Sequence, residues 1–523
     1  DYAGVVSIPG YLIPGDYSSQ TTSGWSWGNL RNINYFLANA PQAAEKAGVP
    51  LSVIQNYVGI ARFFRAWFYF NMVVRYGDVP WYSQPLNPSD TTELYKPRDP
   101  RTLVMDSVLA DLDYACNNID STKDNTRSTI TKWVALAFKS RVCLFEGTFR
   151  EYHPELNLQS TSAMWLQQAV DAAQELMQSG QYTIHVDAAN PQMSYRELFI
   201  DESGAPPSDE VILAYDCSNE FNVFTDANWY YTSPTEGVRL SLTKQFVNTY
   251  LDIDGTRFTD KPGYDTIPFW NETKGRDLRL QQTIRTPGYA RANGALTPPD
   301  FSYTMTGYQP IKYTLASTAT DGVAQNDNSI PVIRYAEVLL NYAEAKAELG
   351  TFTQADWDAT IKVLRVRAGI TNTSMPTTAD PYLQKIYFPN ISNPVLLEIR
   401  RCRGIELALE GFRFDDLLRW GLGNLLEMPY EGMYVPAMNT LYDLNGDGKP
   451  DVDFVSQTPA NKVPGVIYVT IDNSQMKLSN GTSGNLLWLT NQTKEWDNYK
   501  YYYPIPFSEI QLNPNLKQNP GWQ

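Results

Sequence analysis

The sequence predicts a mostly α-helical fold in which pairs of helices carry large irregular insertions. Apolar residues recur at helical spacing through most of the first 180 residues and again between about residues 332 and 420. Three times, at Gly147, Gly180 and Gly350, an Ala- and Leu-rich segment is followed by a glycine, one further residue and an aromatic. The first two glycines are 33 positions apart, close to the roughly 34-residue period of tetratricopeptide-type helix pairs.

The first helical region covers about residues 29–184. Over residues 57–74, aromatic and aliphatic side chains follow a helical period, and Gly77 and Pro80 then end the segment in the order typical of helix termini. The preceding residues 1–28 are rich in Gly, Pro, Ser and Tyr, so we expect an extended lead-in. Similar apolar patterns predict further helices at about 100–116, 131–146 and 163–179.

The second helical region covers about residues 332–422. Gly350 follows its first helix, and Thr353 with Asp356 predicts a capping box that opens the next one. Because the link between these two helices is so short, they are expected to pack antiparallel. The apolar face of the first helix consists of Ile333, Ala336, Leu340, Ala343 and Ala347. We expect helices at about 332–349, 355–368 and 395–420.

Two regions, about residues 185–331 and 423–523, lack this helical pattern and are expected to be rich in loops. Aromatic residues make up 13% of the chain, and many of them fall in the first loop-rich region. Since flat rings on a surface bind sugars, peptides or partner proteins, we expect this region to contact ligand. We expect residues 1–523 to form a single domain.

Composition excludes several classes of function. The formal net charge is −15 and no Lys/Arg-rich block occurs, so nucleic acid is not an expected partner. No apolar run approaches about 18 residues, so no membrane-spanning helix is predicted. The four cysteines are widely separated and are expected to be individual core residues. The familiar hydrolase and nucleotide-binding motifs are missing, and a non-enzymatic protein is expected; a glycosidase carboxylate pair leaves no sequence signature and remains an alternative.

A carboxylate-rich loop at residues 443–453 predicts a structural calcium site. Oxygen-bearing side chains at its first, third and fifth positions, with glycine at the sixth, match the opening of a calcium loop. The twelfth position is Phe454 rather than a bidentate glutamate, so a regular EF-hand is not expected, and a bare acidic turn is the alternative. The candidate ligands are Asp443, Asn445, Asp447, the backbone carbonyl of Lys449, and Asp451 or Asp453.

Five blocks, in order over about 450 residues, resemble the SusD/RagB family of Bacteroidetes outer-membrane lipoproteins. The final block is the most specific. The blocks are RYGDVP at 75–80, IRYAEVLLNYAEA at 333–345, RVRAG at 365–369, ELALEGFRFDDL at 406–417, and YPIP at 503–506 with NPNLKQNPGW at 513–522.

The resemblance implies a SusD-like tetratricopeptide scaffold on the cell surface, at the extracellular face of the outer membrane. It further implies capture of glycan fragments for import through a SusC-type TonB-dependent transporter. Family members are anchored by a lipidated N-terminal cysteine, but the 28 residues before Asn29 contain none. We therefore expect a trimmed chain whose precursor carries the lipid.

Ligand-binding residues are expected at two places. Trp81 and Tyr82 follow the helix that ends at Gly77, and the resemblance implies that aromatics just beyond this helix form a ligand platform, with Arg65 beside them. Core packing is the alternative for each. In contrast, we expect Arg365 and Arg367 to pair with buried carboxylates such as Glu337 or Glu344. Within the loop-rich region 185–331, the candidate rings are Trp229, Tyr230, Trp270, Tyr289 and Tyr303.

The sequence therefore predicts a surface glycan-binding protein that works with a transporter. A peptide-binding member of the same family is the nearest alternative. A glycosidase, or a module that contacts only the transporter, would be a more distant one.

Overall fold

The computed structural model of this protein describes residues 7–201, 209–232 and 239–522. Its contacts divide the chain into two compact units. The first, here called the helical unit, contains Gly10–Gln181, Phe414–Leu426 and Glu495–Gln523; the second, the mixed unit, contains chiefly Tyr182–Arg413 and Glu427–Lys494. Two compact units do not decide between one domain and two, so the single domain stays a prediction.

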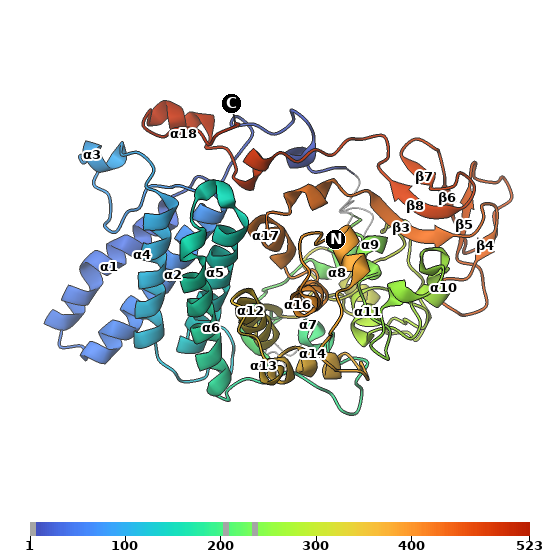
Figure 1. The fold of residues 1–523 in the computed structure, drawn as a ribbon, viewed down its shortest axis with the longest axis horizontal. Helices are drawn as coiled ribbons and strands as arrows, with labels where there is room; N and C mark the ends of the chain where they lie inside the picture. Colours follow the sequence, from blue (N-terminus) through green and yellow to red (C-terminus); the bar gives the residue numbers. More distant parts are fainter. Residues whose placement is uncertain (1–6, 202–208, 233–238, 523) are drawn as a thin grey trace. The chain divides into compact units, whose positions relative to one another are not determined.

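Five long helices form the helical unit, and each contacts the next along the chain. Figure 1 shows them side by side, in blue to teal. The pattern of consecutive paired helices confirms the predicted helical scaffold. The five helices are α1 (Gly28–Lys46), α2 (Leu51–Tyr76), α4 (Arg101–Asn118), α5 (Lys132–Tyr152) and α6 (Ser162–Gln178); shorter turns are α3 (Thr91–Leu94) and α18 (Phe507–Leu512).

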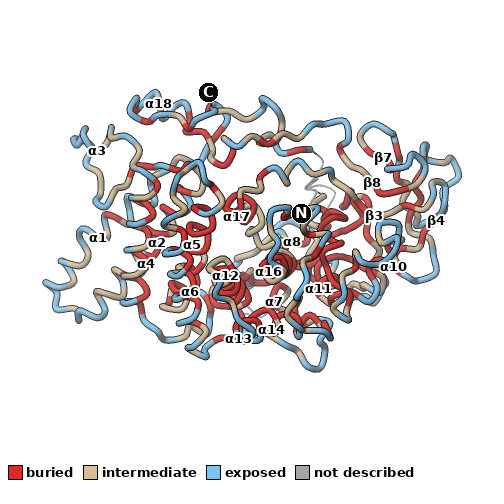
Figure 2. Tube along the Cα trace, in the orientation of Figure 1, coloured by how far each residue is buried: buried red, intermediate tan, exposed pale blue. Residues whose placement is uncertain are grey.

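The centre of the helical unit is α5, which is buried along most of its length (Figure 2). Thr131 caps its start by accepting a hydrogen bond from the backbone of Val134. The helix end expected at Gly147 is wrong, because α5 continues to Tyr152. A Cβ at Gly147 would lie 2.8 Å from the side chain of Leu166 on α6, so this glycine allows two helices to approach closely.

The other two repeated glycines do end helices. Gly180 follows α6 and Gly350 follows α12 (Tyr335–Glu348), with φ of 65° and 69°. This left-handed conformation is the common way to terminate a helix. Thr353 and Asp356 form the predicted capping box at the start of α13 (Gln354–Ala359).

Residues near both ends of the chain complete the helical unit. The ring of Tyr11 stacks on Tyr503 with centroids 4.5 Å apart. The backbone of Tyr503 donates to the carbonyl of Arg75 at 2.7 Å, and that of Phe507 donates to Ser19 at 2.9 Å.

Two helices expected in the second helical region are each interrupted. The segment at 355–368 breaks at Thr360 into α13 and α14 (Ile361–Arg367). The segment at 395–420 breaks between α16 (Pro394–Glu406) and α17 (Phe412–Arg419), where Leu409 and Gly411 adopt φ of 66° and 85°. Shorter helices are α7 (Glu197–Ile200), α8 (Ala227–Thr232), α9 (Lys244–Val247), α10 (Phe269–Glu272), α11 (Leu278–Thr283) and α15 (Pro381–Ile386).

Three small sheets, which the sequence did not predict, also belong to the mixed unit. Antiparallel β1 (Val211–Tyr215) and β2 (Ile330–Arg334) form one. The others lie in the C-terminal region expected to be loops, and their apolar faces help to build a core with Phe246, Tyr250 and Phe454. Their strand orders are β3 (Tyr430–Val435), β8 (Gly484–Trp488), β7 (Met476–Leu478), and β4 (Leu441–Tyr442), β5 (Val452–Val455), β6 (Ile467–Thr470).

A buried ion network crosses the mixed unit. Four cations face four carboxylates, and every side chain in the network is at most 4% exposed. Arg334 alone contacts three carboxylates, at 2.6–2.7 Å. Since the charges balance, the desolvation cost of each ion is offset by its partners. The members are Arg279, Lys312, Arg334, Arg367, Glu210, Asp277, Glu406 and Glu410.

The structural role predicted for Arg365 and Arg367 is confirmed, but their partners differ from those expected. Arg365 pairs with Glu398 at 2.7 Å, and Arg367 pairs with Glu210 and Glu406. All four cysteines are buried and free, as predicted.

Candidate functional site

Trp81 follows α2 after the four-residue turn 77–80, and hydrogen bonds hold both its backbone N–H and its carbonyl. Its ring packs on Tyr69 with centroids 4.2 Å apart and remains half-buried. Its backbone N–H donates to the Asp99 carboxylate at 2.7 Å, and Lys96 Nζ donates to its carbonyl at 2.6 Å. The ring is therefore fixed in position with part of its surface open to solvent.

The next residue, Tyr82, lines a small cavity with Trp27. The two rings meet edge to face, with centroids 5.6 Å apart, and the cavity has a volume of about 220 Å³. Asn34 and Gln84 add polar atoms to its wall. Burial raises the pKa of Tyr82 to about 12, and its hydroxyl donates to the backbone carbonyl of Glu93 at 3.2 Å.

A longer groove lies on the other side of Trp27, between α1 and α2 of the helical unit. Its volume is about 560 Å³. Trp27 contacts Phe68 in this groove at 5.5 Å as well as Tyr82 in the small cavity. Half-buried or exposed rings line the groove together with amide side chains: Phe64, Trp67, Phe68, Asn29, Asn32 and Asn71. We call the groove and the small cavity together the aromatic groove.

Three amides of the aromatic groove are available to a ligand. The side chains of Asn29, Asn32 and Asn71 are exposed, and none of these side chains hydrogen-bonds another residue in the described part of the chain. Ring faces pack against apolar C–H surfaces, while a primary amide both donates to and accepts from hydroxyls. The groove is therefore suited to a ligand with apolar faces and many hydroxyl groups.

Helix packing explains why these groups come together. On α2, Phe64, Trp67, Phe68 and Asn71 recur at intervals of three and four residues, so they share one face. Asn29 and Asn32 share a face of α1, which packs against α2. Sequence reasoning missed Trp27, because it precedes α1 in a segment without periodicity; its only signal is the spacing of Trp25 and Trp27.

Arg65 has a structural role in the helical unit. It is buried, and its guanidinium makes two hydrogen bonds of 2.7 and 2.8 Å to Asp111 on α4. A further bond of 3.3 Å reaches Asn34. Trp81 lies over the same guanidinium at 5.3 Å, so Arg65 supports the platform from below.

The rings predicted in the mixed unit are all half-buried. Trp270, in α10, stacks on Tyr442 at 5.6 Å and packs against the core. Tyr289 lies between two guanidiniums, with Arg196 at 5.5 Å and Arg285 at 5.8 Å from its centroid.

The other three predicted rings keep part of their surface open. Trp229 and Tyr230 lie on α8, and Tyr230 meets Tyr231 edge to face at 5.1 Å. Burial raises the pKa of Tyr303. Their binding role stays a prediction.

The acidic loop at 443–453 turns its carboxylates toward its own backbone. Asp443 accepts from the amides of Gly446 and Gly448 at 2.6 and 2.8 Å, and Asp451 accepts from Leu444 at 2.7 Å. Burial, together with the charges of Asp443 and Asp447, raises the pKa of Asp451.

A cation would relieve the repulsion within this loop, and the oxygen donors suit calcium. Asn445 is buried, and its side chain accepts from the amide of Asp447 at 2.8 Å, while Lys449 donates its own amide to Asp447. Asp453 lies in β5, opposite Leu441, and so belongs to a strand. Within the described ranges, no group of three or more His, Cys, Asp or Glu side chains is arranged to hold a metal. Calcium binding stays a prediction.

Among the described residues, none of the helices combines the length and apolar character needed to cross a bilayer.

The fold defines a tetratricopeptide-like scaffold protein. It contains consecutive paired helices with a ring-lined groove, and small sheets and short helices follow them along the chain. Residues 209–522 match the SusD family, and residues 15–135 match a family described as starch-binding and associating with the outer membrane. Because the first match covers more than half of the chain, the protein belongs to the SusD family. This confirms the resemblance found in the sequence.

Relatives agree with this assignment. SusD-like protein P38 of Formosa agariphila is 25% identical over 393 residues, which are 70% of this chain and 66% of that relative, slightly under two thirds of its length. A SusD-like carbohydrate binding protein from Bacteroides fragilis superposes with a TM-score of 0.64 at 22% identity, over 93% of this chain and 84% of that one.

A third relative is surface glycan-binding protein A from Bacteroides fluxus. It gives a TM-score of 0.54 at 18% identity, over 97% of this chain and 86% of that one. At these identities the two solved structures establish a shared fold, which confirms the predicted fold class.

Proposed function

We propose that this protein binds oligo- or polysaccharides at the outer membrane without altering them, and presents them to a SusC-type TonB-dependent transporter. The aromatic groove carries the proposal, because it combines ring faces with unpartnered amides on two rigid helices. The names of the matched families and of the B. fragilis and B. fluxus relatives support a glycan as the ligand. Surface attachment through a lipid on a longer precursor belongs to the same proposal.

The groove is tested by calorimetric titration of the intact protein with a panel of neutral oligosaccharides from plant, host and microbial glycans. Trp27→Ala and Trp67→Ala, which remove rings that line the small cavity and the groove, should each weaken binding about fivefold, since stacking one sugar face contributes about 1 kcal/mol. Tyr57→Ala is the matched control, because Tyr57 is an exposed ring on α2 outside the groove. Wild-type affinity in both tryptophan variants would remove the groove from the proposal.

Product analysis of each mixture separates the alternatives. Intact sugars are expected after binding; shortened chains would instead identify a glycosidase. Binding of mixed oligopeptides with no response to any glycan would identify a peptide-binding family member.

The transporter is tested by co-expressing the tagged precursor with a SusC-type protein of the same organism. A stoichiometric complex in detergent is expected, and two proteins that elute separately would contradict the partnership.

A further inference from the structure

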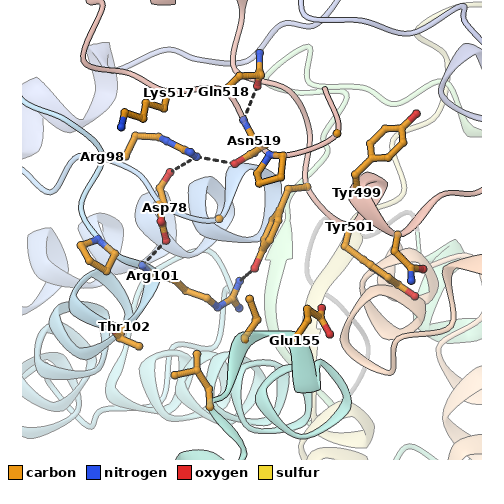
Figure 3. Close-up of a pocket in the computed structure, with 18 residues that line it drawn as sticks. Asp78, Arg98, Arg101, Thr102, Glu155, Tyr499, Tyr501, Lys517, Gln518 and Asn519 are labelled. Atoms are coloured by element: carbon orange, nitrogen blue, oxygen red, sulfur yellow. Dashed lines mark hydrogen bonds between the residues drawn. The ribbon is translucent and has the colours of Figure 1, made fainter. Parts of the chain in front are cut away.

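A second cavity of the helical unit lies apart from the aromatic groove and has a different lining. Its volume is about 810 Å³. The loop after α2, the start of α4 and two stretches of the C-terminal segment, 498–502 and 517–521, form its walls (Figure 3). We call it the C-terminal cavity. It shares no lining residue with the aromatic groove.

Two cations of this cavity have no carboxylate partner in the described part of the chain. Arg98 is half-buried, and its hydrogen bonds go to the Asn519 side chain at 2.7 Å and to the carbonyls of Tyr76 and Asp78 at 3.4 and 3.3 Å. Lys517 is exposed and has no hydrogen bond or ion pair there. Both side chains line the cavity (Figure 3).

The wall behind them adds positive charge. Arg101 is buried and lines the cavity, with hydrogen bonds to Glu146 at 3.1 Å and to the Tyr502 hydroxyl at 3.3 Å. The same Glu146 also accepts from buried Arg150 at 2.8 Å. One carboxylate, that of Glu146, thus pairs with two guanidiniums.

A half-buried guanidinium is costly to desolvate. Burial lowers the pKa of Arg98, and the nearby charge of Asp78 offsets this effect only in part. An anionic ligand group would restore the missing compensation and form charge-assisted hydrogen bonds with the planar guanidinium.

The rest of the lining suits a sugar ring. Tyr499 and Tyr502 are half-buried and offer ring surface. Asp78 is exposed and can accept from hydroxyls, since only one of its oxygens is used, by the Arg101 backbone at 2.7 Å. Glu155 is exposed as well.

We propose that the C-terminal cavity binds an anionic saccharide, with the carboxylate or sulfate of the sugar against Arg98 and Lys517 and the ring against Tyr499 and Tyr502. The proposal rests on the proposed function in taking the ligand to be a saccharide. It adds a second site, separate from the aromatic groove, that selects for charge.

The test uses the intact protein and calorimetry with four probes: hexagalacturonate, its fully methyl-esterified form, a sulfated carrageenan hexasaccharide and hexaglutamate. The methyl ester keeps the sugar rings and removes the charge. We expect one of the two anionic saccharides to bind at least about tenfold more tightly than the ester in 50 mM NaCl. Raising the salt to 500 mM should shrink that preference.

Variants locate the site. Arg98→Gln should lose about tenfold in affinity for the anionic saccharide and nothing for the ester. Because Arg98 also holds the C-terminal segment, Lys517→Gln provides a second variant at an exposed position, with an expected loss of about threefold. Lys46→Gln, an exposed lysine at the end of α1, is the matched control and should bind as wild type. Trp27→Ala should leave the preference for charge intact.

Several outcomes overturn the inference. Equal affinity for the ester and both anionic saccharides would do so, as would a preference that survives in both Arg98→Gln and Lys517→Gln. Hexaglutamate bound as tightly as the saccharides would show an anion site without sugar selectivity. Binding of neutral glycans alone would remove this cavity and leave the proposed function standing, whereas no binding of any saccharide would remove both.

Discussion

Replacing Glu406 with glutamine is expected to destabilise the mixed unit more than any surface substitution. Glu406 accepts from Arg279 at 2.8 Å and from Arg334 at 2.6 Å, and it also contacts Arg367. These four side chains are at most 2% exposed. The network holds four cations and four carboxylates, so the neutral amide leaves one uncompensated positive charge in the interior.

The size of the loss follows from that burial. Removing one partner from a buried ion pair costs about 3–5 kcal/mol. Large domains lose about 2 °C in melting temperature per kcal/mol. The unfolding transition of the mixed unit should therefore fall by about 6–10 °C.

Thermal unfolding at pH 7, followed by tryptophan fluorescence and circular dichroism, measures this change. Asp358→Asn is the control, since it breaks an exposed pair with Lys362 and should leave the melting temperature unchanged. If Glu406→Gln had the same melting temperature as the control, Glu406 would make no net contribution to stability, and the charges of the network would have to be solvated.

The pH dependence gives an independent reading of the same carboxylate. Three guanidiniums hold the pKa of Glu406 well below its usual value. Its contribution to stability is thus complete above the unfolded pKa of about 4.3 and is lost as the pH falls through the folded pKa. Glu406→Gln should therefore lose less stability than wild type on acidification.

Three further predictions concern stability. Burial lowers the pKa of Lys312 and Lys494 to about 8, below the unfolded value, so the unfolded state binds more protons above pH 8. The unfolding free energy from urea titrations should rise between pH 8 and 9.5, and a flat profile would contradict these buried lysines. Gly147→Val places side-chain atoms against Leu166 and should cost about 1–3 kcal/mol in thermal unfolding; an unchanged melting temperature would mean that α6 can move away. If the acidic loop binds calcium, EGTA should lower the melting temperature, added calcium should restore it, and Asp443→Asn should abolish the response; indifference to EGTA would exclude a stabilising ion.

The long helices could be predicted because local rules determine them. In α2 the apolar period ends at Gly77 and Pro80, and the structure ends the helix at Tyr76. The break after α16 could not be predicted from the sequence. It depends on Leu409, which adopts a left-handed backbone conformation that leucine avoids on its own. Contacts from elsewhere hold that turn: Lys312 donates to the carbonyl of Ala408 at 2.7 Å, and Tyr313 donates to that of Leu409 at 3.3 Å.

Only part of the candidate site could be predicted, because only part of it depends on local sequence. The position of Trp81 follows from the end of one helix, whereas the aromatic groove depends on which faces of α1 and α2 meet. Gly147 shows the same limit. A single sequence does not distinguish a glycine that ends a helix from a glycine that allows a neighbouring helix to pack closely. For Arg367, residue type indicated a buried pair, but its partners Glu210 and Glu406 lie 157 and 39 positions away.

The position of residues 495–522 in the helical unit has a consequence for biosynthesis. Translation produces α1 to α6 early, yet Tyr11 gains its stacking partner Tyr503 only after residue 503 has emerged from the ribosome. The C-terminal cavity is likewise without two of its walls until then. A ribosome-bound chain that has not yet released residues 495–522 therefore carries an unfinished helical unit, and the cavity is complete only after these residues have left the ribosome.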